Sequence, residues 1–454
     1  MIKRQHGLLA LTAAFSVVAL TACGGGGGPA AGGFTKDITG SVTAWGFENA
    51  DEVGTSRIDY ANGVLKKSDV TVDIDQSAFD AQKFTTLAAS GKIPDVVQMS
   101  SQYVTTYAAQ GLIMPLDECY AVNDVKPNDQ YYPQVIDDVS YDGSVYAVPQ
   151  FYQPPAIMLN TRVMDEVGVT AEDLNTSDQD AFLAAVAKMT VMDGANPTRM
   201  GFDPQGVSQA GLWLLSMGGQ IIGDDGKPTL DDPKNAEAID FLKKIYDEQG
   251  GYANAKSFVD SFDVFGDNNS FVADQVGAAV FQQWYVNVLT PYVDKVQISS
   301  TPIMDSSGKP FTVSSGTAFV IPTAAKNPAA GCAWALSLTS QDAWMAAGAA
   351  RAETIASTPG AINTGLFTGS PAADQAIRDE YVKTSGNAGF DSAIDGYYSI
   401  LDSGKSFGSS PAGQQIQTEL QNAVVSALLG EKSSADALKD AQAAAQRAYD
   451  QVAG

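Results

Sequence analysis

Histidine and cysteine, which carry much of the chemistry of enzymes and metal sites, are scarce in this chain of 454 residues, which has one histidine and three cysteines. The histidine, His6, lies between the basic residues Lys3 and Arg4 and an apolar run over 7–20. This pattern is typical of a signal peptide, which is removed from the mature protein. A mature chain without histidine excludes Ser-His-Asp triads, Cys-His pairs and histidine-ligated metals. We therefore predict no metal and no other cofactor.

The cysteine that follows the apolar run has a specific context. The residues Leu20-Thr21-Ala22-Cys23 resemble the lipobox of bacterial lipoproteins, in which the cysteine is diacylated, for example with palmitate, and becomes the first mature residue. The resemblance implies a signal peptide over 1–22, a lipid on Cys23 and a glycine-rich tether over 23–35. Two or more acyl chains hold a protein on a membrane stably, whereas one does so only marginally. The alternative is an ordinary secreted protein in which Cys23 has no role.

The charge of the chain is strongly negative. It has 27 lysines and arginines against 52 aspartates and glutamates, a formal net charge of −25. Such a surface repels nucleic acid and anionic lipid. We therefore expect no nucleic-acid partner, and contact with the membrane through the lipid anchor alone.

The elements that position polar side chains begin with an alternation of strand and helix. Strands are predicted over 40–47, 70–75 and 93–101, with a helix over 79–91 between the second and the third. This order is typical of parallel βαβ units. Ligands of open α/β sheets bind outside the carboxyl ends of such strands.

Prolines interrupt what would otherwise be one long strand over 143–169, at Pro149, Pro154 and Pro155. Because proline cannot donate to a sheet ladder, we interpret this stretch as a crossover between two lobes. Helices are predicted farther along, over 178–190, 210–219, 235–250 and 413–454.

Five segments, in this order, resemble one family. They are KFTTLAASGKIPDVVQMSS (83–101), YAAQGLIMPLDE (107–118), YDGSVYAVPQFYQPPAIMLNTRVMDEVGV (141–169), FVADQVGAAVFQQW (271–284) and SSADALKDAQAAAQRAYDQ (433–451). The family is that of the family 1 extracellular solute-binding proteins, the capture subunits of carbohydrate-importing ABC transporters, which include maltose-binding proteins.

The resemblance implies an α/β, two-lobed, periplasmic-binding-protein-like type II fold with three interlobe crossovers. The N-terminal lobe would comprise 36–153 and 314–352, and the C-terminal lobe 154–313 and 353–454. The protein would be a monomer that is lipid-anchored to the outer face of the cell membrane. It would capture a carbohydrate, which we expect to be an oligosaccharide, between its lobes. It would then deliver this carbohydrate to the transmembrane subunits of an ABC permease.

Sugars are bound by aromatic faces, which stack on the C–H side of the ring, and by planar acids and amides, which hydrogen-bond the hydroxyl groups. Strand ends, loops and the resemblance together give these candidate ligand residues: Trp45, Glu48, Asp80, Ser101, Gln102, Tyr103, Gln153, Trp213, Trp284, Arg351, Glu353 and Tyr397. Alternatives stay open for some of them. Trp213 and Tyr397 fit a core as well as a cleft, and Arg351 and Glu353 fit an exposed ion pair.

In the family, the helix that contains Cys332 returns to the lobe that contains Cys119, so the resemblance implies a disulfide between them. The alternative is two separately buried thiols. The main competing function is a secreted carbohydrate-active enzyme with a pair of carboxylates. A structural or adhesive lipoprotein would instead show repeats or low-complexity stalks, and this sequence has neither.

Overall fold

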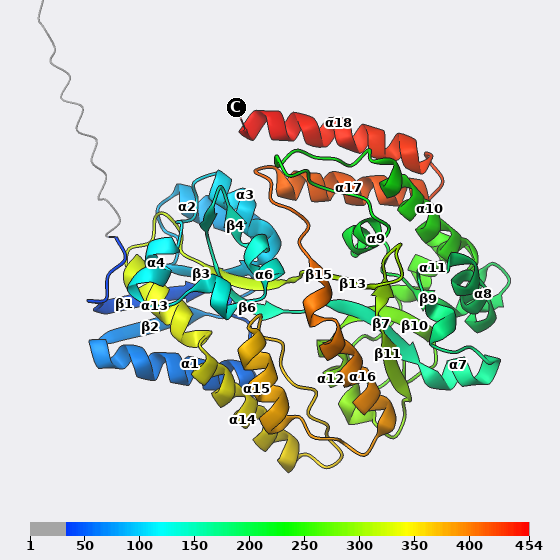
Figure 1. The fold of residues 1–454 in the computed structure, drawn as a ribbon, viewed down its shortest axis with the longest axis horizontal. Coiled ribbons are helices and arrows are strands. Elements are labelled where there is room, and N and C mark those ends of the chain that lie inside the picture. The colour runs from blue at the N-terminus through cyan, green and yellow to red at the C-terminus, as the bar shows by residue number, and fades with distance from the viewer. Residues whose placement is uncertain (1–32, 454) are drawn as a thin grey trace, which may run out of the picture. The chain divides into compact units, whose positions relative to one another are not determined.

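The computed structural model describes residues 33–453, so the predicted signal peptide and Cys23 lie outside the described residues. One five-stranded sheet forms the core of the N-terminal lobe, in the order β2-β1-β3-β14-β6. Its strands are β1 (Gly40–Trp45), β2 (Val70–Asp75), β3 (Val96–Ser100), β6 (Val148–Tyr152) and β14 (Gly316–Val320). The pairs β1–β2 and β1–β3 are parallel, as the βαβ pattern predicted. The helices α1 (Glu52–Leu65), α13 (Pro328–Leu338) and α14 (Gln341–Ser357) pack together beside this sheet (Figure 1).

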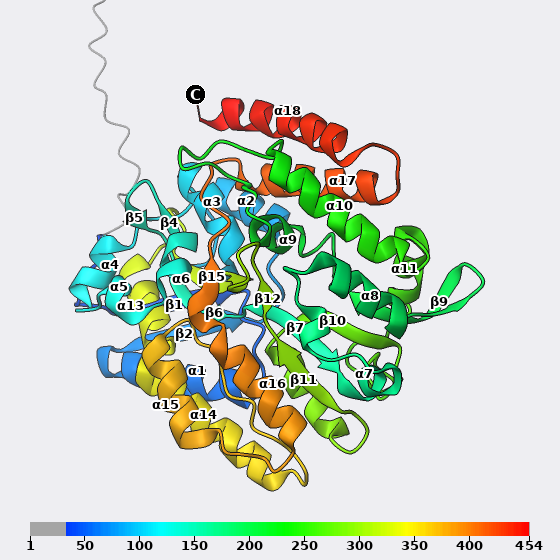
Figure 2. The ribbon, with the colours of Figure 1, turned by 45° about the vertical axis from the view of Figure 1, so that its right-hand side comes forward.

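A second five-stranded sheet, in the order β11-β7-β10-β9-β8, forms the core of the C-terminal lobe. Its strands are β7 (Pro155–Asn160), β8 (Val191–Asp193), β9 (Asn196–Asp203), β10 (Val276–Gln282) and β11 (Ile298–Thr301). Every residue of β7 is buried, which suits the continuous apolar run in this part of the sequence. Around this lobe lie α10 (Pro233–Asp247), α16 (Ala388–Ser399), α17 (Gly413–Leu428) and α18 (Ser434–Val452), and Figure 2 shows α17 and α18 side by side. The fold is therefore a two-lobed α/β fold.

The chain crosses from one lobe to the other through short segments that separate a strand of one lobe from a strand of the other. The first crossing separates β6 from β7 at Gln153 and Pro154, within the predicted proline-rich stretch. The second separates β13 (Pro310–Val313) from β14 at Ser314 and Ser315, and β13 also pairs with β15 (Gly404–Lys405). The helix α15 (Pro371–Tyr381) packs against α14 of the N-terminal lobe, although it follows the lobe boundary expected at residue 352. The next helix, α16, packs on β11 of the C-terminal lobe. The third crossing thus follows α15.

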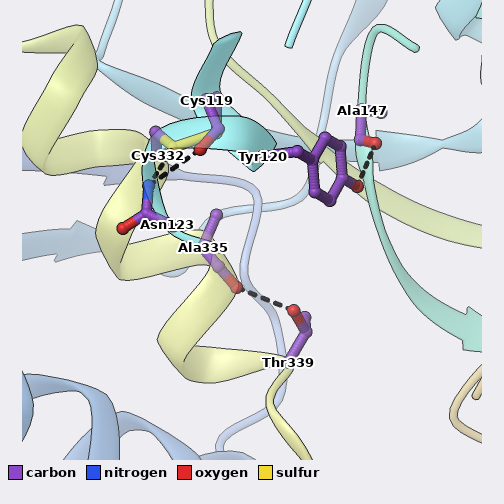
Figure 3. The surroundings of a disulfide bond; sticks show 7 residues. All are labelled: Cys119, Tyr120, Asn123, Ala147, Cys332, Ala335 and Thr339. Carbon is purple, nitrogen blue, oxygen red and sulfur yellow. Dashed lines mark hydrogen bonds between the residues drawn. A yellow bond between two sulfur atoms is a disulfide. The ribbon is translucent and has the colours of Figure 1, made fainter. Parts of the chain in front are cut away.

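A disulfide between Cys119 and Cys332 joins two helices of the N-terminal lobe (Figure 3). Cys119 lies on α4 (Asp117–Val122) and Cys332 on α13, and their Cα atoms are 6.0 Å apart. Both residues are fully buried, and the Asn123 side-chain amide donates a hydrogen bond to the Cys119 carbonyl oxygen at 2.8 Å. The bond ties the helix that returns after the second crossing to the first half of the lobe.

Two features are absent from the described part of the chain, a membrane-spanning helix and a metal-binding cluster. Between residues 33 and 453, no helix has the length and apolar character that crossing a membrane requires. The same residues contain no cluster of histidine, cysteine, aspartate and glutamate that could hold a metal ion.

Candidate functional site

A cavity of about 280 Å³ lies between the end of β3 and the helix α17. On the N-terminal side, β3 ends at Ser100 and the short turn Ser101–Tyr103 follows, so that Ser101, Gln102 and Tyr103 all line the cavity. On the other side, α17 contributes a row of glutamines, Gln414, Gln417 and Gln421. We call this space the Tyr103 cavity. The ring of Tyr103 is held by contacts with Phe79 and Tyr107, at centroid distances of 5.2 and 5.9 Å.

A second cavity, of about 170 Å³, brings together three residues that the sequence predicted separately. Gln153 from the first crossing, Trp284 at the start of α12 (Trp284–Leu289) and Arg351 from α14 all line it. The remaining walls come from Asn49, Asp51, Val53, Phe151, Gln283, Asn287 and the loop Thr364, Gly365, Leu366 and Phe367. We call this space the Trp284 cavity. Both lobes contribute to it.

Several amide side chains in these two cavities have no partner among the described residues. Gln102 and Gln417 in the Tyr103 cavity, and Gln153 and Asn287 in the Trp284 cavity, make no side-chain hydrogen bond within residues 33–453. An amide offers two donors and an acceptor. These side chains are therefore available to a ligand that carries hydroxyl groups.

A protein-family comparison decides the class of protein. Residues 60–377 match the family model described as "Bacterial extracellular solute-binding protein". The chain belongs to this family. The family expected from the sequence is thus confirmed, and membership places the protein outside the cytoplasm. No match is found among curated proteins.

Solved structures share the two-lobed fold of this solute-binding protein. One is an ABC transporter solute-binding protein from Thermotoga lettingae bound to α-D-tagatose, with 19% identity, TM-score 0.69, and 90% of this chain and 99% of that chain covered. CpMnBP1 with mannotriose bound gives 19% identity, TM-score 0.71, and 89% and 99% coverage. The sugar-binding protein MalE from Xanthomonas citri gives 15% identity, TM-score 0.67, and 91% and 98% coverage. The family and these neighbours are binding proteins rather than enzymes.

In the solute-binding protein, Arg351 is already engaged in ion pairs. Its guanidinium pairs with Glu52 and with Asp51, the latter at 3.3 Å between a terminal nitrogen and Oδ2. Its neighbour Glu353 is exposed and lines neither cavity. The arginine therefore forms a fixed, charge-compensated wall of the Trp284 cavity.

Besides Glu353, five predicted ligand residues lie elsewhere. Trp45 and Trp213 are each 1% exposed, and their indole N–H groups donate to Ser77 Oγ at 3.1 Å and to the Pro204 carbonyl oxygen at 2.9 Å. Tyr397 is fully buried, and its hydroxyl donates to the Phe281 carbonyl oxygen at 2.8 Å. The structure thus places these three side chains in the core rather than in the cleft. The other two, Glu48 and Asp80, are exposed and line neither cavity.

Asp80 has a local role instead. Its carboxylate accepts the N–H of Lys83 at 2.5 Å and so caps the N-terminus of α2 (Ala81–Ala89). Aspartate at this position satisfies a backbone donor that the helix itself leaves unpaired.

Sequence reasoning missed the α17 side of the Tyr103 cavity. Gln414, Gln417 and Gln421 are spaced three and four residues apart, which puts them on one face of a helix. A row of amides on one face was a usable signal. No comparable signal marked the loop 364–367, because its place beside Trp284 depends on the packing of α14 and α15.

The Tyr103 cavity also contains one carboxyl group with an altered acidity. Asp138, at the end of α6 (Pro133–Asp138), lines the cavity. Burial raises the pKa of Asp138 to about 7, although the nearby hydroxyl groups of Ser406 and Ser314 oppose the shift. This wall of the cavity is therefore poorly hydrated.

Proposed function

We propose that this protein is the lipid-anchored, substrate-binding subunit of an ABC transporter, and that it captures a carbohydrate between its lobes and delivers it to a membrane permease. The observation that carries the proposal is the pairing of unengaged amides with aromatic rings in the Tyr103 and Trp284 cavities. Amides bond sugar hydroxyls, and aromatic rings stack on the C–H face of the sugar. The sugars bound by the solved neighbours support the same chemistry.

A thermal-shift screen tests carbohydrate binding. The full chain is melted alone and with each member of a panel of free monosaccharides and oligosaccharides. A sugar at one hundred times its dissociation constant adds roughly 2.7 kcal/mol to the free energy of unfolding. We expect at least one member to raise the melting temperature and to be recovered intact. A panel without any shift contradicts carbohydrate capture, and hydrolysis of a bound sugar favours the enzyme alternative.

The lipid anchor is tested separately, because Cys23 lies outside the described residues. In the Cys23→Ser variant, acylation has no thiol to modify, so we expect the protein to move from the membrane fraction to the soluble extracellular fraction. A Cys23→Ser protein that remains with the membrane contradicts lipid anchoring at this residue.

A further inference from the structure

A third cavity, of about 480 Å³, has walls that belong entirely to the C-terminal lobe. Its size lies within the range of about 300–1,000 Å³ typical of small-molecule sites. We call it the aromatic cavity because five rings line it, together with four valines. These residues are Tyr246, Tyr252, Phe262, Phe281, Tyr285, Val207, Val259, Val264 and Val425.

Contacts between the rings hold them in place. Phe281 and Tyr285 stack with centroids 3.9 Å apart, and Tyr246 meets Tyr252 edge to face at 5.1 Å. Side chains fixed in this way lose little conformational freedom when a ligand binds. The cavity is therefore preorganised to receive an apolar group.

Most polar groups in this wall already bond to other parts of the protein. The Lys256 ammonium contacts both carboxylate oxygens of Asp260, at 2.8 and 2.7 Å. The Tyr246 hydroxyl accepts the N–H of Gly206 at 3.1 Å, and the Ser208 hydroxyl donates to the Gln205 carbonyl oxygen at 3.1 Å. This contrasts with the unengaged amides of the Tyr103 and Trp284 cavities. A sugar ring placed here would bury hydroxyls with few partners, which costs free energy for each one.

Asp203 shows how dry this wall is. One of its oxygens accepts the N–H of Gln205 at 3.0 Å, and the residue is 7% exposed. Burial raises the pKa of Asp203 to about 6. Removal of water has this effect on a carboxyl group that has no cation beside it.

The aromatic cavity shares one lining residue with the Tyr103 cavity. Gln421 on α17 lines the aromatic cavity and the Tyr103 cavity alike. Phe265 follows the cavity residue Val264 and stacks on Trp284, with centroids 5.9 Å apart and planes 24° apart. Val264 and Phe265 are 36% and 68% exposed, so the apolar surface continues outward along this loop. The Tyr103 cavity and the aromatic cavity therefore meet at Gln421.

We propose that the aromatic cavity binds an apolar aglycone, so that the captured solute is a glycoside with an aryl or alkyl substituent rather than a free sugar. The inference rests on the proposed carbohydrate function. The sugar hydroxyls would meet the unengaged amides, and the substituent would meet the rings, where most polar groups already bond to the protein and the Tyr285 hydroxyl is a buried exception.

Calorimetric titration with two matched ligand series tests this subsite. The full chain is titrated with the methyl and the 4-nitrophenyl glycosides of glucose, mannose, galactose and maltose. An aryl ring buries enough apolar area for us to expect at least about tenfold tighter binding of the 4-nitrophenyl member of a pair. Ser208→Trp, which places bulk into the cavity from an exposed position, should abolish this preference and leave methyl glycoside affinity unchanged.

A matched pair of valines provides the control. Val264 in the cavity wall and Val191 on β8 are 36% and 42% exposed, so serine at either position should cost the fold little. We expect Val264→Ser to weaken 4-nitrophenyl glycoside binding about threefold and Val191→Ser to leave it unchanged.

The outcomes separate this inference from the proposed function. Equal binding of both series, or an aryl preference that survives in Ser208→Trp, overturns the aglycone subsite and leaves carbohydrate capture intact. Absence of binding in both series, together with a thermal-shift screen in which no free sugar stabilises the chain, overturns carbohydrate capture and the subsite with it. If a free sugar does stabilise the chain while neither glycoside series binds, only the subsite is overturned.

Discussion

Trp284 and Trp213 differ in what surrounds their rings, and sequence could not separate them. Trp213 lies within a predicted helix and Trp284 follows an apolar run, and hydrophobic periodicity alone does not say which ring faces a cavity. In the structure, Trp213 packs edge to face on Phe202 and Phe241, whereas Trp284 lines a cavity. The difference arises from tertiary packing. The resemblance identified Trp284, but neither it nor the pattern decided between core and cleft for Trp213 and Tyr397, and both missed the buried role of Trp45.

Substitution of each tryptophan by alanine should therefore have opposite effects. Trp284→Ala should weaken binding of the sugar found by the thermal-shift screen by about 1–3 kcal/mol and leave the melting transition in place, because the ring is partly exposed. Trp213→Ala should lower the free energy of unfolding by about 3–5 kcal/mol, because it empties a core site. Calorimetric titration and chemical denaturation measure the two quantities. A Trp284→Ala protein that loses stability but keeps its affinity contradicts the cleft assignment.

Asp374 predicts an unusual dependence of stability on pH. The residue is 1% exposed, one oxygen accepts the Thr368 N–H at 2.7 Å, and burial raises the pKa of Asp374 to about 7. Between the unfolded pKa near 3.8 and about 7, the folded state holds the proton that the unfolded state has released. The free energy of unfolding should therefore fall as pH rises from 4 to 7 and level off above 7.

Denaturation at pH 5 and at pH 8 measures this effect, which Asp138 and Asp203 should reinforce in the same direction. Asp374→Asn, which cannot ionise, should reduce the difference in the free energy of unfolding between pH 5 and pH 8 by up to a few kcal/mol. The matched control is Asp129→Asn, at an exposed aspartate, which should leave the slope unchanged. An unchanged slope in Asp374→Asn would show that this carboxyl group does not retain its proton in the folded state.

At the scale of elements, the sequence predicted the first three strands and the first crossing. The strands β1, β2 and β3 are short apolar or alternating runs bounded by polar or turn residues, and Pro154 and Pro155 mark the crossing from β6 to β7. The limits of the lobes were harder to place. The position of α15 on α14 depends on a small cluster that includes Trp344, Leu366 and Ile377, and residues so far apart in sequence give no local signal.

The disulfide between α4 and α13 also belongs to this scale. It closes a loop of 213 residues, so its loss should lower the free energy of unfolding by about 2–5 kcal/mol. The double variant Cys119→Ala/Cys332→Ala should match the reduced wild type in chemical denaturation. Alkylation of the unfolded, unreduced protein followed by mass spectrometry checks the bond directly. Two labelled thiols would contradict it.

At the scale of the molecule, we expect the two lobes to move as units about the three crossings. Each lobe has its own sheet and a large core cluster, whereas short segments such as Gln153–Pro154 and Ser314–Ser315 join them. Such segments are the usual hinges of domain closure around a ligand. Residues from both lobes line the Trp284 cavity, so a bound sugar would bridge them.

Small-angle X-ray scattering of the full chain with and without a saturating sugar tests capture between the lobes most directly. The sugar is one that raises the melting temperature, and a sugar that produces no shift serves as the control. We predict that the radius of gyration falls with the stabilising sugar and stays constant with the control. An unchanged radius of gyration at saturation would contradict closure of the lobes around the carbohydrate.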